Sequence, residues 1–155
     1  MKKFVKFLFL AVAVLVLGYI FFYSAEVLFS PTSAQPKACF GSNCFFVELA
    51  KTQAEQEKGL MFRQKLDENK GMLFLFQKEG EYPFWMKNTL IPLDIIWIND
   101  EHKVVFINEN SQPCPVIGEC PLINPGVSAT YVLEINAGLA KKYWVKIGDD
   151  IDISF

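Results

Sequence analysis

Three charged residues in largely apolar surroundings are best placed to do chemistry. Asp94 lies inside the apolar stretch 93–98 and Glu134 inside 131–136, while Arg63 follows a short segment of helical character. Two carboxylates in a dry site can take different pKa values and act as a general acid and a general base. A buried charge must also find a partner, so the structural alternative is an ion pair from Arg63 to Asp94 or Glu134 that ties a helix to a sheet.

A second group of residues surrounds Trp85. On a strand over residues 84–89, side-chain alternation places Trp85, Lys87 and Thr89 on one face, and Asn88 with two apolar neighbours on the other. An aromatic plane beside a cation and a hydroxyl is suited to stacking on a sugar ring while hydrogen bonding its polar edge. The alternative is a solvent-facing strand whose tryptophan is partly covered.

The four cysteines fall into two close pairs. Cys39 precedes Cys44 and Cys114 precedes Cys120, each pair enclosing a short loop, which predicts two local disulfides and an oxidising compartment. Structural zinc requires paired C-x2-C spacings or further histidines, and the sole histidine is His102. We therefore predict no metal site and no cofactor here.

Methionines allow a different metal. Met61, Met72 and Met86 are thioether ligands of the kind that copper(I) selects, although their spacing follows no tight motif. Methionine more often fills gaps in a hydrophobic core, so packing is the favoured interpretation.

The elements that must position these residues are short. The hydrophobic pattern and the turn residues predict strands over 45–50, 72–76, 82–88, 93–98, 103–108, 131–136 and 151–155, with helices over 53–60 and 137–143. Thr52 and Glu55 form a capping-box signature at the start of the first helix. This pattern predicts a mainly β (α+β) fold, a compact antiparallel barrel or sandwich, because no long helix is available to connect parallel strands.

Two segments of this fold stand out. The stretch 93–98 is apolar at both alternating positions apart from Asp94, so we expect it to be covered on both faces. The stretch 109–125 contains four prolines and shows no periodicity, and it is either a functional loop or a surface loop held by a disulfide.

The N-terminus predicts a membrane anchor. Residues 7–25 contain no charge, and at about 1.5 Å per helical residue they match a hydrocarbon core of roughly 30 Å. Lysines precede this run, so the positive-inside rule leaves the N-terminus in the cytoplasm and the body outside, in a periplasm or at the cell surface. We expect an anchor over residues 1–29, a linker over 30–38 and a folded domain over 39–155. The alternative is a cleaved signal peptide, with Thr32 and Ala34 at the cleavage site.

The charge balance excludes one class of partner. From Gln35 onward, 12 Lys and Arg face 16 Asp and Glu, a net charge of −4. Nucleic acid requires a clustered positive surface, so we predict no nucleic-acid partner.

Several short motifs also stand in the order and spacing of a known family. They are Gly59-Leu60-Met61-Phe62-Arg63, Gly71-Met72-Leu73-Phe74, Phe84-Trp85-Met86-Lys87-Asn88-Thr89, Ile91-Pro92-Leu93-Asp94 and Leu133-Glu134 with Gly138. From about Phe46 to its end the chain resembles the prokaryotic domain-of-unknown-function family 192. The resemblance implies a small β-rich domain, often found behind an export signal, and it implies no reaction. The cysteine pairs are outside the motif.

These observations favour a noncatalytic binding module for a small polar or carbohydrate-like ligand or a partner. The candidate ligand-binding residues are Arg63, Trp85, Lys87, Asn88, Thr89, Asp94 and Glu134. The alternative is an envelope-polymer hydrolase with Asp94 and Glu134 as its carboxylates. Whether the chain is an enzyme stays open, and the oligomeric state is not predicted.

The anchor gives a testable expectation. Because residues 1–29 should remain attached and integral, alkaline carbonate washing should leave the full-length protein in the membrane pellet. Recovery of a soluble form that starts near Gln35 would show instead that the segment is a cleaved signal.

Overall fold

The computed structural model describes residues 12–20 and 35–155, apart from residue 116. The chain divides into two compact units, Met1–Ala34 and Gln35–Phe155. In the first unit, residues 12–20 form a helix. No helix within the described part of the chain is long and apolar enough to cross a membrane. The predicted span over residues 7–25 lies outside the described residues except for 12–20, and so does the predicted linker up to residue 34.

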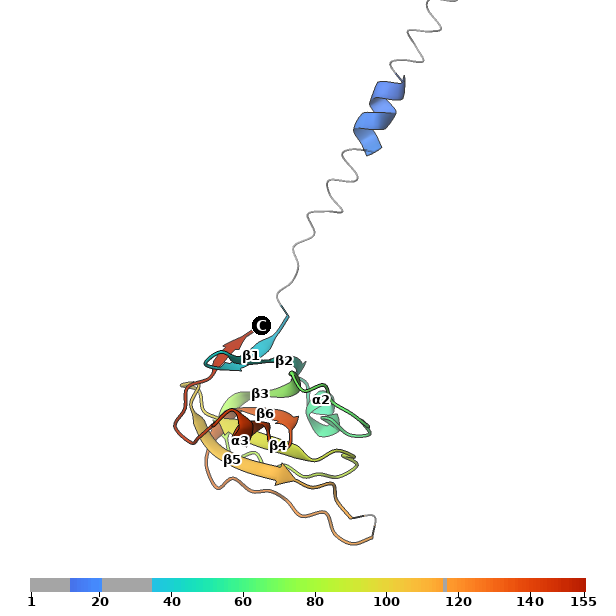
Figure 1. Ribbon diagram of the computed structural model, residues 1–155. Helices are drawn as coiled ribbons and strands as arrows, with labels where there is room; N and C mark the ends of the chain where they lie inside the picture. Colours follow the sequence, from blue (N-terminus) through green and yellow to red (C-terminus); the bar gives the residue numbers. More distant parts are fainter. Residues whose placement is uncertain (1–11, 21–34, 116) are drawn as a thin grey trace, which may run out of the picture. The chain divides into compact units, whose positions relative to one another are not determined.

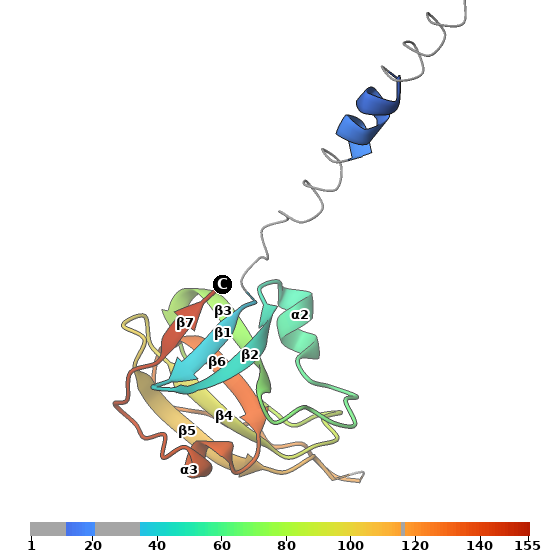
Figure 2. The same cartoon turned by 45° about the horizontal axis from the view of Figure 1, so that its top comes forward.

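The second unit is built on one curled sheet, which makes it mainly β as predicted (Figure 1). Its strands are β1 (Lys37–Phe40), β2 (Asn43–Ala50), β3 (Lys70–Gly80), β4 (Leu93–Ile98), β5 (Val104–Ser111), β6 (Ala129–Asn136) and β7 (Asp152–Ser154). They lie in the order β5-β4-β6-β3-β2-β1-β7, and the curl forms a half-barrel that Figure 2 shows from a second direction. The helices are α2 (Gln53–Lys58) and α3 (Leu139–Lys142).

One strand pair corrects the predicted topology. β2 and β3 are parallel, whereas the other paired strands of this sheet are antiparallel. Parallel strands need a connection of about a dozen residues or more, but that connection does not have to be a long helix. Here it runs over residues 51–69 and contains only the short helix α2. The sheet is mainly antiparallel, as predicted, but the reasoning that no parallel pair could form without a long helix is wrong at β2 and β3.

The local signals at the first helix are confirmed. The Thr52 hydroxyl accepts a hydrogen bond from the Glu55 backbone N–H at 3.3 Å, and the Glu55 carboxylate accepts from the Thr52 N–H at 2.8 Å. Hydrogen bonds from the backbone N–H groups of Thr52 and Lys51 to the Glu55 carboxylate lower the pKa of Glu55. Gly59, at φ 45°, follows the last helical residue, so the helix ends at Lys58 rather than at residue 60.

Both predicted disulfides are present. Cys39 and Cys44 are directly paired across the antiparallel strands β1 and β2, with their Cα atoms 4.0 Å apart. Cys114 and Cys120 are joined within the loop between β5 and β6. The first strand was not predicted from the sequence. β1 begins at Lys37, inside the segment 30–38 that was expected to be a linker.

The sheet has a hydrophobic cluster on each face. The concave face carries side chains such as Phe45, Ile96 and Leu133, and helix α3 packs against it through Leu139 and Ala140. A second set of apolar side chains lies on the opposite, outer face. It includes Met72, Phe74, Ile95, Trp97 and Val132, which are covered by side chains from the loops, among them Leu60, Phe84, Met86 and Ile123. All six residues of β4 are buried, which confirms that this strand is covered on both faces.

The predicted strand over 82–88 is wrong. Residues 81–92 form a loop whose single bridge joins Phe84 to Ile123, and Asn88 takes a φ of 56°. Pro83 has no N–H for a ladder, which disfavours a continuous strand. The alternating apolar residues of this segment instead pack one by one onto the outer face of the sheet.

Asp94 lies on the concave face, where its carboxylate accepts hydrogen bonds from backbone N–H groups. Its carboxylate accepts hydrogen bonds at 2.8 Å from the N–H of Asn110 in β5 and at 2.8 Å from the N–H of Ala140 in the first turn of α3. Gly138 begins α3 without a capping side chain, so Asp94 satisfies a helix donor that the helix's own sequence leaves open.

Replacing this carboxylate should destabilise the domain. We expect Asp94→Asn to lower the free energy of unfolding by about 1–3 kcal/mol, because an amide must turn its NH₂ toward one of two buried donors. The exposed Asp100→Asn is the matched control and should change it by less than about 0.5 kcal/mol. Urea unfolding of the two variants measures the difference, and equal stabilities would contradict this role.

Candidate functional site

Trp85 is the exposed aromatic residue of the loop over residues 81–92. Both of its neighbours are anchored: the Phe84 ring packs edge-on against Phe74 at 4.9 Å and Trp97 at 5.5 Å, and Met86 is 4% exposed. Trp85 itself remains 42% exposed. The loop therefore holds this indole outward between the partly buried Phe84 and the buried Met86.

The polar residues after Trp85 form a tight turn. The Lys87 ammonium lies 4.8 Å from the centroid of the Trp85 ring, a cation–π contact. Asn88 is exposed, and its carbonyl accepts a hydrogen bond from the Phe62 N–H at 2.8 Å. Thr89 is 7% exposed, so of the three side chains predicted to share one face, Thr89 turns inward.

A surface hollow opens beside this turn, and we call it the Trp85 hollow. One wall comes from residues 85–90, except Met86. The other comes from the loop after β5 and includes the Cys114–Cys120 disulfide; its lining residues are Pro113, Cys114, Pro115, Gly118, Glu119 and Cys120. Its volume of about 840 Å³ falls in the range of small-molecule sites, roughly 300–1,000 Å³. The long loop after β5 thus forms one wall of the Trp85 hollow, and the disulfide within the loop constrains that wall.

Arg63 does not take the partners predicted for it. Its guanidinium forms a two-pronged ion pair with Glu48 of β2, at 2.5 and 2.6 Å, rather than with Asp94 or Glu134. The hydrogen bond lowers the pKa of Glu48 and raises that of Arg63. Both side chains are substantially exposed, so the pair contributes little to stability.

The two candidate carboxylates are on opposite faces of the sheet. In the β4–β6 pairing Asp94 is opposite Ile135, and Glu134 is opposite Ile95. Directly opposed residues point to the same face and successive residues to opposite faces. Asp94 therefore faces the concave cluster and Glu134 the outer one, and the predicted paired-carboxylate site does not form.

Glu134 is the buried acid of the outer face. Glu134 is only 5% exposed, and its Oε2 has no hydrogen-bond partner. Burial raises the pKa of Glu134 to about 8, which the nearby positive charge of Arg63 offsets only in part. Within the described part of the chain, Thr130 Oγ1 is the other buried side-chain oxygen without a partner.

The methionines have packing roles in two of three cases. Met72 and Met86 are buried in the outer cluster, as gap-filling methionines are. Met61 is half-buried, and its sulfur accepts a contact from the Asn88 amide at 3.8 Å. No group of three His, Cys, Asp or Glu among the described residues is arranged to hold a metal ion.

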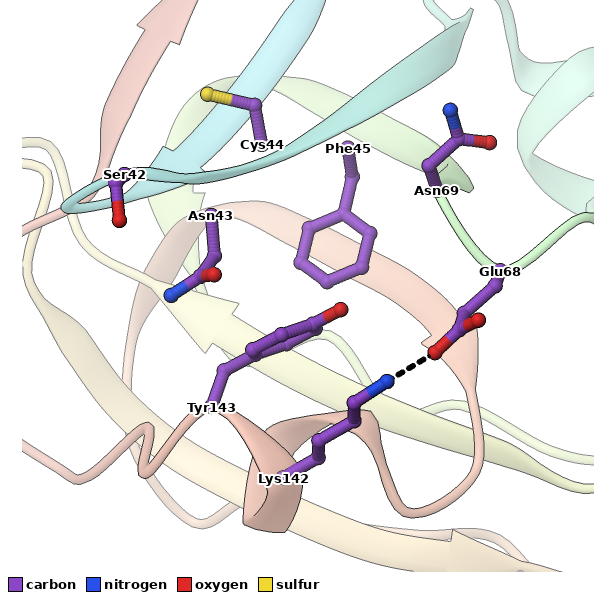
Figure 3. Close-up of a pocket in the computed structure, with 8 residues that line it drawn as sticks. All are labelled: Ser42, Asn43, Cys44, Phe45, Glu68, Asn69, Lys142 and Tyr143. Atoms are coloured by element: carbon purple, nitrogen blue, oxygen red, sulfur yellow. Dashed lines mark hydrogen bonds and ion pairs between the residues drawn. The ribbon is translucent and has the colours of Figure 1, made fainter.

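A second hollow lies next to the Cys39–Cys44 hairpin (Figure 3). Ser42, Asn43 and Asn69 contribute polar groups, and the Lys142 ammonium is paired with the Glu68 carboxylate. Neither of the buried unpartnered oxygens found in the described residues lines it. Its charges are satisfied within the hollow, so the Trp85 hollow and Glu134 are the stronger candidate site.

Residues 36–153 match the model of the DUF192 family, described as "Uncharacterized ACR". The chain belongs to the DUF192 family. The family resemblance in the sequence is thereby confirmed over the whole β domain. No curated protein is similar enough in sequence to serve as a relative.

Two crystal structures resemble this DUF192 chain. A protein of unknown function from Novosphingobium aromaticivorans is 38% identical, with a TM-score of 0.68, and the match covers 79% of this chain and 89% of that one. A protein from Sinorhizobium meliloti, provisionally described as a transcription regulator, is 33% identical, with a TM-score of 0.69 over 77% of this chain and 92% of its own.

The buried acid predicts an unusual dependence of stability on pH. Below pH 4.5 Glu134 is protonated in both the folded and the unfolded state. Between pH 4.5 and about 8 it ionises in the unfolded chain, whereas in the folded protein it keeps its proton. Its contribution to the stability of the folded state therefore becomes less favourable as the pH rises. Glu134→Gln removes this loss. The variant's stability relative to the native protein should therefore increase from pH 5 to pH 8 by a few kcal/mol, at up to about 1.4 kcal/mol per pH unit.

Urea unfolding across this pH range measures the difference. Glu48→Gln is the matched control: the folded state lowers the pKa of Glu48 below its usual 4.5, so Glu48 is ionised in both states from pH 5 to pH 8 and this variant's difference should stay nearly constant with pH. A Glu134→Gln difference that is constant with pH would mean that Glu134 is ionised in the folded protein.

Proposed function

We propose that this DUF192 protein is a membrane-anchored, extracytoplasmic, noncatalytic binding module that takes a small carbohydrate-like ligand in the Trp85 hollow. The observation that carries the proposal is the indole of Trp85, which stays 42% exposed although its two neighbours are anchored in the outer cluster. An exposed indole at the edge of a hollow supplies an apolar surface that a ligand can cover when it binds.

The polar surroundings fit a sugar-like ligand. Lys87, Asn88 and Glu119 border the hollow with hydrogen-bonding groups, and Trp85 supplies an aromatic surface. Sugars present apolar C–H faces and hydroxyl edges, which such a combination can recognise together. The disulfide at Cys114 reduces the freedom of the facing wall, so less ordering is required when a ligand binds.

The separation of Asp94 from Glu134 supports a noncatalytic role. A hydrolase of the envelope-polymer type needs two carboxyl groups on either side of one bond, roughly 5–10 Å apart in a shared cleft. Asp94 is fully buried on the concave face and engaged by two backbone donors, so it is not available to a ligand in the Trp85 hollow.

The proposed location rests on the disulfides and the apolar N-terminal run. Two disulfides in a small domain are typical of an oxidising compartment outside the cytoplasm. The acidic balance of the domain does not support the DNA-related role that the provisional description of the Sinorhizobium protein suggests.

A glycan array tests the ligand class. We expect the native protein to bind one or more oligosaccharides, and Trp85→Ala to weaken that binding at least roughly tenfold because the stacking surface is lost. Trp144→Ala is the matched control, since Trp144 is 79% exposed and does not line the hollow.

Thermal unfolding completes the test. Trp85→Ala should lower the free energy of unfolding by less than about 1.5 kcal/mol, as for a surface position. Binding to no glycan, or equal binding by the two tryptophan variants, would contradict the proposal. A loss of several kcal/mol would place Trp85 among the packing residues instead.

A further inference from the structure

A small cavity lies next to the Trp85 hollow, and we call it the Glu134 cavity. It is bounded by residues 56–61, at the end of α2 and the turn that follows, and by Phe84, Trp85 and Thr89 of the loop. Phe74 and Glu134 contribute to it from the sheet. Its volume of about 30 Å³ accommodates a group the size of one water molecule, which needs about 10–15 Å³ on the same measure.

Two polar groups of this cavity are poorly satisfied. The Glu134 Oε2 has no partner, and the Thr89 hydroxyl reaches only the Lys87 carbonyl, at 3.5 Å, which is the limit for a hydrogen bond. Both residues are more than nine-tenths buried. A buried polar atom that lacks a partner is destabilising, so these two oxygens mark a position that a further polar group would occupy favourably.

Gly59 keeps the cavity open. It has a φ of 45°, and a Cβ at this position would lie 3.7 Å from the Glu134 Oε2 and 3.2 Å from the Phe74 Cζ. Any side chain here would therefore occupy the space in front of the carboxyl group. The same glycine also provides the backbone turn that ends α2.

We propose that the Glu134 cavity binds a single uncharged hydroxyl group of the ligand held in the Trp85 hollow, with Glu134 as hydrogen-bond donor and Thr89 as acceptor. This proposal rests on the proposed function and adds the chemistry of one contact. Trp85 lines both spaces, so a ring placed against its indole is adjacent to the cavity. A hydroxyl group both donates and accepts, which matches the unpartnered Glu134 carboxyl group and the unused acceptor capacity of the Thr89 hydroxyl.

The charges around the cavity favour a neutral group over an ion. Burial raises the pKa of Glu134 to about 8, so at neutral pH it presents a protonated carboxyl group. Arg63, whose positive charge acts on Glu134, is already paired with Glu48. Glu57 and Lys58 from α2 carry opposite charges, and Lys87 lies over Trp85 on the loop side. A cationic group would have to deprotonate Glu134, and an anionic one would meet the charge of Glu57 as well as that of Lys58, with no net positive charge to favour it.

Solution NMR with defined sugars tests this contact. The probes are the methyl glycosides of glucose, galactose, mannose and N-acetylglucosamine, added to the domain with labelled Trp indole N–H, Thr methyl and Glu carboxyl groups. We expect a bound sugar to shift the Trp85 and Thr89 signals together. It should also raise the pKa of Glu134, because a ligand that accepts its proton in a hydrogen bond binds the protonated form better.

Four variants separate the contact from general packing. Glu134→Gln keeps a donor and should bind equally at pH 6.5 and 9.5, whereas the native protein should bind several-fold more weakly at pH 9.5. Glu134→Leu should lose binding. Thr89→Val, which keeps the shape and removes the hydroxyl, should weaken binding by roughly tenfold, while Thr89→Ser should retain it.

The outcomes distinguish this inference from the proposed function. If a sugar shifts Trp85 while the titration of Glu134 is unchanged and Thr89→Val binds normally, the cavity holds a structural water only, and the inference fails while the proposed function stands. If none of the sugars shifts the Trp85 signal, both fail. A coupled shift of Trp85, Thr89 and the Glu134 pKa supports both.

Discussion

The fold depends on covering both faces of a sheet in which the neighbouring strands β4 and β6 have no exposed residue. β4 is buried along its whole length, so the carboxyl groups on β4 and on its neighbour β6 are removed from water. The two buried carboxyl groups are accommodated in different ways. Asp94 is compensated by two backbone N–H groups that also fix β5 and α3, whereas Glu134 has no such donors and remains protonated. The first carboxyl group is structural, and the second is left with unused hydrogen-bonding capacity.

The covering of the outer face determines where a site can form. Loops rather than a helix or a second sheet cover that face, and each contributes a few apolar side chains to the cluster beneath it. Loops packed in this way leave hollows between them, and residues between buried anchors are turned outward. Trp85 is such a residue, while Thr89 is turned inward toward Glu134. The exposed aromatic group and the unsatisfied acid are therefore two results of one packing arrangement.

Local signals in the sequence predicted the local features. The capping box, the two disulfides and the double burial of β4 all follow from residues close together in the chain, and all are confirmed. Features that depend on distant partners were not predictable in this way. The parallel pairing of β2 with β3, the Arg63–Glu48 ion pair and the opposite orientation of Asp94 and Glu134 require the register between strands, which no short pattern encodes. The loop around Trp85 resembled a strand because its alternating apolar residues pack onto a sheet without joining it.

The central claim is that Glu134 is a neutral carboxylic acid in the folded protein at neutral pH. Infrared difference spectroscopy of the native protein against Glu134→Gln tests this most directly, because a protonated carboxyl group has a C=O stretching band that a carboxylate lacks. The account predicts this band at pH 7, with loss of the band as the pH rises through about 8. A spectrum at pH 7 that shows only carboxylate bands for Glu134 would contradict it.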